Sequence, residues 1–241
     1  MPPLDRTLIV MPAFNEAQSV GQVVEEVFTK LHGVNVLVVD DGSSDATSDV
    51  ARRAGARVAT LPFNLGVGGA VRVGFRFALE NGYTTVVQID ADGQHDPSSV
   101  PVLLEQLDHA DLVLGARFAG EGDYRVRGPR SWAMKCLAVV VSISSKTSLT
   151  DTTSGYRASG PRAIALFAEH YPAEYLGDTV ESLVIAARAG LTIRQIPVSM
   201  RVRQAGTPSH NPVKAATYLV RAVVALVFAY VRPSSTYRVV G

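Results

Sequence analysis

The sequence has a single cysteine, Cys136, and a single tryptophan among its 241 residues. One cysteine excludes an intramolecular disulfide, so a hydrophobic core must hold the fold together. Cys136 lies among apolar residues, where an inert buried thiol is more common than a nucleophile. The apolar run over residues 222–231 is too short to cross a bilayer as a helix.

Several functional signatures are also missing. The chain contains no Walker motif, and its glycine-rich stretch over residues 62–69 has Val71 where a dinucleotide-binding loop would place its third glycine. No basic-aromatic patch or helix-turn-helix pattern indicates nucleic-acid binding. Residues 1–6 lack the basic-then-apolar layout of a signal peptide. We therefore expect a cytoplasmic protein that binds no nucleic acid.

The composition supports a folded core, and the charge is divided unevenly along the chain. Hydrophobic residues make up 47% of the sequence, and the formal net charge is +1. Residues 1–120 contain 8 Lys and Arg against 15 Asp and Glu, whereas residues 121–241 contain 15 against 7. The acidic half is consistent with metal binding, and the basic half with binding to phosphate or an anionic membrane surface.

Short apolar runs alternate with helical patterns along much of the chain. The continuous apolar run over residues 34–39 is typical of a strand covered on both faces. We predict strands at 7–11, 34–39, 56–61, 83–89, 112–116 and 191–198, with helices between most of them and another at 178–189. Residues 151–157 are predicted to form an ordered loop. This alternation predicts an α/β fold with a mostly parallel central sheet flanked by helices.

Two carboxylates directly follow the predicted strand over residues 83–89. Asp90 and Asp92 are one residue apart, and Gly93 permits a tight turn before Asp96 caps the next helix. Alternation along an extended chain directs the two carboxylates to one side. Such oxygen ligands suit Mg²⁺ or Mn²⁺ shared with a phosphate-bearing substrate. His95 is either a group beside the metal or a hydrogen-bonding residue of the turn.

Polar residues end two further strands. Asn15 and Glu16 follow the first strand, where Asn15 is predicted to cap the next helix, and Asp40 and Asp41 follow the second. Together with Asp90 and its neighbours, they place acceptors along one edge of the sheet. The base, ribose and metal-bound diphosphate of a nucleotide would occupy such an edge.

The second half of the chain is rich in arginine and in apolar stretches. A Gly-rich stretch over residues 117–130 contains four arginines, and residues 201–210 form a basic loop that can close on an anion. Residues 132–144 are mostly apolar and form either a core helix or a surface that meets lipid. Residues 213–231 form either an interfacial helix or a helix packed on this domain or a second subunit.

Four motifs in this order resemble those of family 2 glycosyltransferases, and in particular the polyprenyl-phosphate (dolichol-phosphate) sugar synthases. They are Met11-Pro-Ala-Phe-Asn-Glu16, Val39-Asp-Asp-Gly-Ser-Ser-Asp45, Asn64-Leu-Gly-Val-Gly-Gly-Ala70 and Asp90-Ala-Asp-Gly-Gln-His-Asp-Pro97. The resemblance spans about residues 6–212 and includes the elements at 115–118, 151–157 and 201–203. It implies a GT-A fold and inverting transfer of a sugar from a nucleotide-diphospho-sugar.

The resemblance also implies roles for individual residues. The expected nucleoside pocket contains Pro12, Phe14, Glu16 and Asp41, and the metal site contains Asp90, Asp92 and Gln94. Candidates for the diphosphate and the acceptor phosphate are Arg117, Arg130, Arg201 and Arg203. The expected substrate-binding set also includes Ala13, Asp40, Gly68, Ala91 and Ser209. Asp92, Arg117, Arg203 and Glu181 are the candidate catalytic residues.

The expected organisation is a GT-A domain over residues 1–211, followed by an amphipathic helix and tail over 212–241. Residues 1–117 would form the nucleotide and metal half, and 118–211 the acceptor half. The acceptor is expected to be polyprenyl phosphate at the inner face of the cell membrane, in cell wall glycan biosynthesis, with Mg²⁺ or Mn²⁺. A small membrane protein or a second copy of the chain is a possible partner.

Two other functions remain open: transfer to a glycan hydroxyl with Glu181 as base, and non-catalytic binding of a nucleotide sugar. The sequence does not identify the sugar, and UDP is only slightly favoured over GDP.

Overall fold

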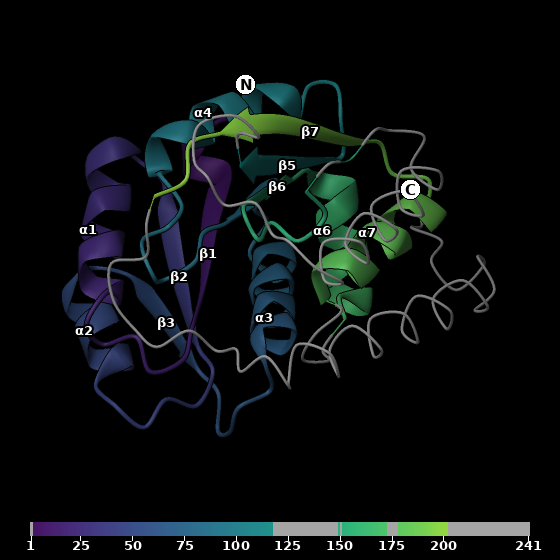
Figure 1. Cartoon of the computed structure of the whole chain (residues 1–241). Helices are drawn as coiled ribbons and strands as arrows, with labels where there is room; N and C mark the ends of the chain where they lie inside the picture. The colour runs from purple at the N-terminus through teal and green to yellow at the C-terminus, as the bar shows by residue number, and fades with distance from the viewer. Residues whose placement is uncertain (1, 118–148, 150, 173–177, 202–241) are drawn as a thin grey trace, which may run out of the picture.

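Seven β-strands form the centre of the protein in a computed structural model that describes residues 2–117, 149, 151–172 and 178–201. They are β1 (Thr7–Ala13), β2 (Asn35–Asp40), β3 (Arg57–Thr60), β4 (Thr85–Gln88), β5 (Leu112–Arg117), β6 (Arg157–Ser159) and β7 (Ile193–Val198). Within these residues they join in the order β3-β2-β1-β4-β6-β5-β7 (Figure 1). β6 is antiparallel to β4 and β5, and the other neighbouring pairs are parallel. The predicted mostly parallel sheet is therefore confirmed.

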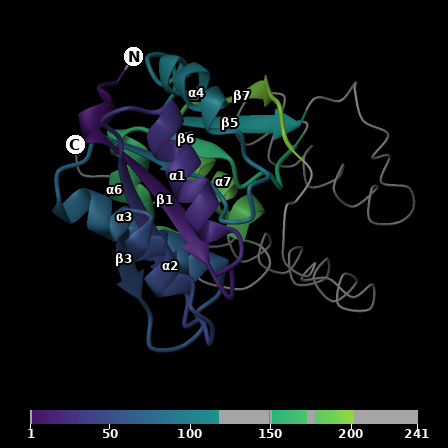
Figure 2. The ribbon, with the colours of Figure 1, turned by 90° about the vertical axis from the view of Figure 1, so that its left-hand side faces the viewer.

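Helices cover both faces of this sheet. One face carries α1 (Val20–Lys30), α2 (Thr47–Arg53) and α4 (Val100–Gln106), and the other carries α3 (Val67–Glu80), α6 (Pro161–His170) and α7 (Asp178–Arg188). Figure 1 shows α1 and α2 on the left of the sheet and α3, α6 and α7 on the right, and Figure 2 is viewed from the α1 side. Single turns of 3-10 helix, η1 (Leu4–Arg6) and η2 (Pro97–Ser99), precede β1 and α4.

Successive residues of the central strands point to opposite faces, as the two-residue period of a strand requires. In β1, Leu8 and Val10 pack on the α3 side, whereas Ile9 and Met11 pack on the α1 side. All four side chains are fully buried. Because helices cover both faces, the central strands are apolar at nearly every position, as the run over residues 34–39 predicts.

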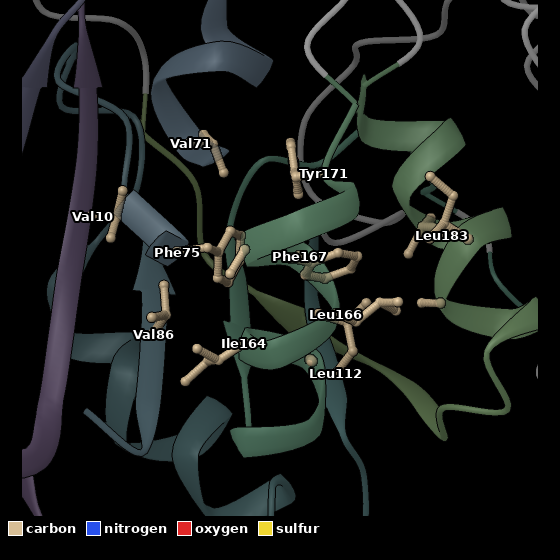
Figure 3. Close-up of a cluster of buried hydrophobic side chains, with 14 of the residues drawn as sticks. Val10, Val71, Phe75, Val86, Leu112, Ile164, Leu166, Phe167, Tyr171 and Leu183 are labelled. Carbon is tan, nitrogen blue, oxygen red and sulfur yellow. The ribbon is translucent and has the colours of Figure 1, made fainter. Parts of the chain in front are cut away.

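An aromatic cluster joins α3 to α6 (Figure 3). The ring centroid of Phe75 lies 5.1 Å from that of Phe167 and 5.5 Å from that of Tyr171. Burial of a side chain such as Phe75 stabilises the fold by about 1.5–3 kcal/mol. Val10 of β1 and Val86 of β4 belong to the same core, so the cluster holds these helices against the sheet.

Among the described strands and α-helices, the sequence pattern does not predict β6 and α6. The predicted loop over residues 151–157 ends in β6, whose three residues pair with Val86–Gln88 on one side and Leu112–Leu114 on the other. Such a short strand forms because of distant partners, so it leaves no local signal. α6 does have buried residues at helical spacing, Ala163, Ile164 and Phe167, and this signal could have been found.

Three predicted segments lie outside the described residues: the apolar stretch 132–144, the basic loop after Arg201 and the apolar stretch 213–231. In the described ranges, no helix combines the length and the hydrophobicity needed to cross a membrane. β6 and β7 come from the predicted acceptor half, yet they complete the same sheet as β1 to β5.

Candidate active site

The loops that follow β1, β2 and β4 meet at one edge of the sheet. These strands are parallel neighbours, with Ala13 opposite Asp40 and Val10 opposite Gln88. Because the carboxyl ends of parallel strands share an edge, the register brings the loop after Asp40 and the loop that begins at Asp90 to the same side. Ligands bind at this edge in open α/β sheets.

The Asp41 carboxylate braces the glycine-rich loop that precedes α3. Its two oxygens accept hydrogen bonds from the backbone amides of Leu65 and Gly66, at 2.7 and 2.8 Å. Burial raises the pKa of Asp41, and these two amide bonds oppose the increase. The neighbouring Gly42 has a φ of 76°, and a Cβ there would lie 2.8 Å from the carbonyl carbon of Phe63. The two loops are therefore packed against each other, and the predicted contact between Asp41 and a nucleoside remains a prediction.

Asn15 does not cap the first helix, so that prediction is wrong. α1 begins at Val20 with Ser19 at its N-cap, and Asn15 adopts a φ of 56° in the loop before it. The Asn15 side-chain oxygen instead accepts a hydrogen bond from the backbone amide of Ser44 at 2.8 Å. Asn tolerates this left-handed conformation better than most residues. It therefore ties the loop after β1 to the loop after β2.

The other residues predicted to bind the donor lie along the same edge. Phe14 is 46% exposed, and the Glu16 carboxylate accepts a hydrogen bond from the Ser19 hydroxyl at 2.8 Å. Asp40 is buried and accepts hydrogen bonds from the Ser43 amide at 2.8 Å and the Ser48 hydroxyl at 2.5 Å. The predicted set is completed by Pro12, half-buried, and by Ala13, Gly68 and Ala91, all buried.

Asp90 and Asp92 begin the loop after β4 and differ in exposure. The Asp90 side chain is 37% exposed, and one of its oxygens lies 3.4 Å from the side-chain nitrogen Nε2 of Gln88. Asp92 is buried and accepts a hydrogen bond from the backbone amide of Gln94 at 3.0 Å. Gly93, with a φ of 78°, turns the chain between Asp92 and Gln94.

This donor set fits a divalent metal ion that is shared with a substrate. Among the described residues, no group of three or more His, Cys, Asp or Glu side chains is close enough to enclose an ion. Asp90, Asp92 and the side-chain oxygen of Gln94 would supply hard oxygen donors to such an ion, and their joint coordination of it remains a prediction. Mg²⁺ is commonly bound by one or two carboxylates together with substrate phosphates, so the residues present are sufficient.

The guanidinium of Arg201, the last residue that the structure describes, pairs with two carboxylates. One terminal nitrogen lies 2.8 Å from a Glu26 oxygen of α1, and the other lies 2.8 Å from an oxygen of Asp96, the N-cap of η2. The Arg201 amide also donates to the carbonyl of Gln94 at 2.9 Å. Arg201 is predicted to bind phosphate, and in this structure that role competes with Glu26 and Asp96. No local sequence pattern indicates this pairing, because Glu26 and Arg201 are 175 positions apart.

The remaining predicted residues are placed only in part. The backbone of Arg117 lies at the carboxyl end of β5, and Glu181 lies half-buried on α7. Arg130, Arg203 and Ser209 lie outside the described residues. Their predicted roles, like those of the other site residues, remain predictions.

The arrangement of strands and helices matches that of a solved glycosyltransferase structure. The structure is similar to glucosyl-3-phosphoglycerate synthase from Mycobacterium tuberculosis, solved with Mn²⁺ and UDP-glucose. The TM-score is 0.70 at 21% sequence identity, over 94% of this chain and 79% of that chain. The described sheet and its helices therefore form a GT-A-like α/β fold, as the resemblance implies.

The sequence comparisons then identify the family. Residues 8–168 match the family model described as Glycosyl transferase family 2. The chain is 34% identical over 209 residues to undecaprenyl-phosphate mannosyltransferase from Micrococcus luteus, covering 83% of this chain and 86% of that protein. It is 26% identical over 210 residues to a UDP-N-acetylglucosamine–dolichyl-phosphate N-acetylglucosaminyltransferase from Methanococcus voltae, covering 79% and 83%. The chain belongs to glycosyl transferase family 2, so it is a glycosyltransferase.

Proposed function

We propose that this protein transfers a monosaccharide from a nucleotide-diphospho-sugar to polyprenyl phosphate, with inversion and with a divalent metal ion. The observation that carries the proposal is the Asp90 and Asp92 pair at the carboxyl end of β4, in a family 2 chain. A relative that aligns with 83% of the chain is named for undecaprenyl phosphate, and another is named for dolichyl phosphate. Their names specify different sugars, so the donor sugar is left to experiment.

Asp90, Asp92 and Gln94 are the proposed metal ligands. The ion, Mg²⁺ or Mn²⁺, supplies a Lewis acid for the negative charge that develops on the leaving diphosphate. The partly exposed Asp90 carboxylate faces solvent, whereas the buried Asp92 is oriented by the Gln94 amide. This combination leaves room for phosphate oxygens while it fixes one protein ligand. The Mn²⁺ reported with the similar structure supports the use of a divalent ion.

The remaining residues position the two phosphates and the nucleoside. Arg117, Arg130 and Arg203 are the proposed phosphate contacts, because a planar guanidinium matches the geometry of phosphate oxygens. The loops after β1 and β2, which Asn15 and Asp41 tie to their neighbours, provide the wall for the nucleoside.

The nature of the nucleophile separates the two catalytic hypotheses. A polyprenyl phosphate is already ionised near neutral pH, so in-line attack requires positioning and no strong base. A sugar hydroxyl would require a carboxylate base, and Glu181 is the candidate. Replacement of Glu181 by Gln should therefore leave partial activity with polyprenyl phosphate and abolish transfer to a hydroxyl.

The experiment is a radiolabelled donor panel with polyprenyl phosphate and Mn²⁺. UDP-glucose, UDP-galactose, UDP-N-acetylhexosamines and GDP-mannose are each tested, and label is counted in an organic-extractable, mild-acid-labile lipid. We expect one donor to give such a lipid, and Asp92→Ala to abolish the transfer. Asp49→Ala is the matched control, because Asp49 lies exposed on α2, where it forms an ion pair with Arg52.

Each other outcome changes the assignment. Label in a glycan with no labelled lipid would favour the hydroxyl acceptor. Binding of a nucleotide sugar without turnover or metal dependence would favour a non-catalytic module. Full activity of Asp92→Ala would refute the metal site.

The acceptor also implies a location. We propose that the protein acts at the inner face of the cell membrane as a peripheral protein, alone or with a membrane partner. Co-sedimentation with vesicles that contain anionic lipid tests this, and absence from both vesicles and cell membranes would contradict it.

A further inference from the structure

We propose that His95 positions Asp90 for the metal ion, and that Tyr156 holds His95 in the required orientation. This inference rests on the proposed function, because it concerns residues 90–96, the metal-binding loop, which carries the proposed ligands Asp90, Asp92 and Gln94. His95 belongs to that loop and lies five residues after Asp90, whereas Tyr156 comes from the segment that leads into β6.

The His95 ring contacts Asp90 at two points. Its Nδ1 accepts a hydrogen bond from the backbone amide of Asp90 at 3.1 Å, and its Nε2 lies 3.7 Å from a carboxylate oxygen of the same residue. The preceding amide, that of Ile89, donates to the carbonyl of Val10 at 3.0 Å. The chain therefore leaves the sheet at Asp90, and the His95 ring provides the acceptor that the next amide needs.

Tyr156 restricts the His95 ring to one orientation. The two rings stack with centroids 4.7 Å apart and planes 12° apart, and His95 and Tyr156 are 4% and 0% exposed. The Tyr156 hydroxyl donates to the carbonyl of Asp96 at 2.7 Å, so the same side chain also holds the residue after His95. Burial raises the pKa of Tyr156, which keeps this hydroxyl protonated as a donor.

Gly155 limits Asp90 from another direction. A Cβ at Gly155 would lie 3.3 and 3.4 Å from the two Asp90 carboxylate oxygens. It would lie 3.0 Å from the side-chain nitrogen Nε2 of Gln88. The backbone before β6 thus passes directly beside this carboxylate. Asp90 is enclosed by the His95 ring and by the Gly155 backbone, although its side chain remains 37% exposed for a ligand.

His95 could act through its Nδ1 acceptor, which would position Asp90, or through its stacked ring, which would only stabilise the fold. If the Nδ1 acceptor orients Asp90, its loss should weaken metal binding even when the ring stack is kept. If His95 only fills space, loss of the stack should matter instead, and it should appear as lost stability. Partners that orient metal ligands typically change metal affinity or activity by about 10- to 100-fold when they are replaced.

Two variants separate these possibilities. His95→Phe keeps a ring that can stack on Tyr156 and removes the acceptor. His95→Asn keeps an oxygen close to the position of Nδ1 and removes the ring. The probe is Mn²⁺, with free Mn²⁺ measured by electron paramagnetic resonance during titration of the full chain, alone and with UDP. Thermal unfolding is measured for each variant, and Tyr156→Phe, which retains the ring, provides a milder change at the second residue.

We expect His95→Phe to raise the Mn²⁺ dissociation constant by roughly 10-fold or more, and His95→Asn to retain most of the affinity. The activity of His95→Phe should recover as Mn²⁺ is raised. Mn²⁺ binding by His95→Phe equal to that of the unmodified protein would overturn this inference and leave the proposed function intact. Loss of affinity in both variants in proportion to lost stability would also overturn it. If the unmodified protein bound no Mn²⁺, the metal assignment and this inference would both fail.

Discussion

Arg201 offers the sharpest test of the structure, because two different roles can be distinguished by experiment. The sequence predicts a phosphate contact, whereas the structure pairs Arg201 with Glu26 and Asp96 at 2.8 Å each. These two carboxylates belong to α1 and to the N-cap of η2, so the guanidinium joins the segment after β7 to α1 and to the loop that carries the proposed metal ligands. The perturbation is Arg201→Met, which keeps most of the aliphatic stem and removes the charge.

The expected loss of stability lies between that of surface and buried ion pairs. Hydrogen bonds to charged groups contribute about 1.5–3 kcal/mol, and exposed ion pairs contribute about 0.2–1 kcal/mol. The side chains of Arg201, Glu26 and Asp96 are 32%, 24% and 23% exposed, so water screens them in part. We expect Arg201→Met to lower the free energy of unfolding by about 1–2 kcal/mol. For a chain of this size, the fall in Tm would be roughly 3–6 °C.

The loss should depend on pH in a defined direction. Burial alone would raise the pKa of Asp96, but hydrogen bonds from Ser98 and Arg201 outweigh it and lower the pKa. A carboxyl whose folded pKa lies below its unfolded value of about 3.9 contributes fully above that value and loses the contribution as the pH falls through the folded pKa. The difference in the free energy of unfolding between Arg201→Met and the unmodified protein should therefore persist from about pH 7 to pH 5 and narrow below about pH 4.

The assay is thermal unfolding across this pH range, together with calorimetric titration of UDP and GDP. Arg194→Met is the control, since Arg194 is an exposed β7 arginine that donates to the Gln106 side chain. It should change stability by less than about 0.5 kcal/mol. An unchanged Tm for Arg201→Met together with weaker nucleotide binding would refute the structural role and support the phosphate contact.

Two further substitutions test the packing around the sheet. Gly74→Ala should destabilise the protein by about 1–3 kcal/mol, because a Cβ there would lie 2.3 Å from a Val10 methyl carbon; thermal unfolding measures this, and an added Val10→Ala should restore part of the loss. Arg157→Lys should cost at least about 2 kcal/mol, because the buried guanidinium donates to four oxygens in residues 152–154 and at the start of α7. A Tm for Arg157→Lys equal to that of the unmodified protein in the same assay would contradict the second expectation.

The sequence by itself determined the features that depend on neighbouring residues. The apolar run over residues 34–39 indicates a strand covered on both faces, and β2 lies there with helices on either side. Asp96 followed by Pro97 indicates a helical start, and the Asp96 carboxylate accepts the Ser98 amide at 2.9 Å as the cap of η2. The position of Asp90 after an apolar strand likewise follows from local order. Such features are visible because the interacting groups lie within a few residues.

Only the tertiary structure decided which distant groups meet. β6 is a strand because two other strands flank it, and its three residues could not indicate this alone. Asn15 bonds to Ser44 rather than capping α1, since the loops after β1 and β2 lie side by side. The stacking of His95 on Tyr156 joins residues that are 61 positions apart in the printed sequence. Sequence spacing therefore indicated the carboxylates proposed to bind the metal ion, whereas the packing of the sheet determined what holds them in position.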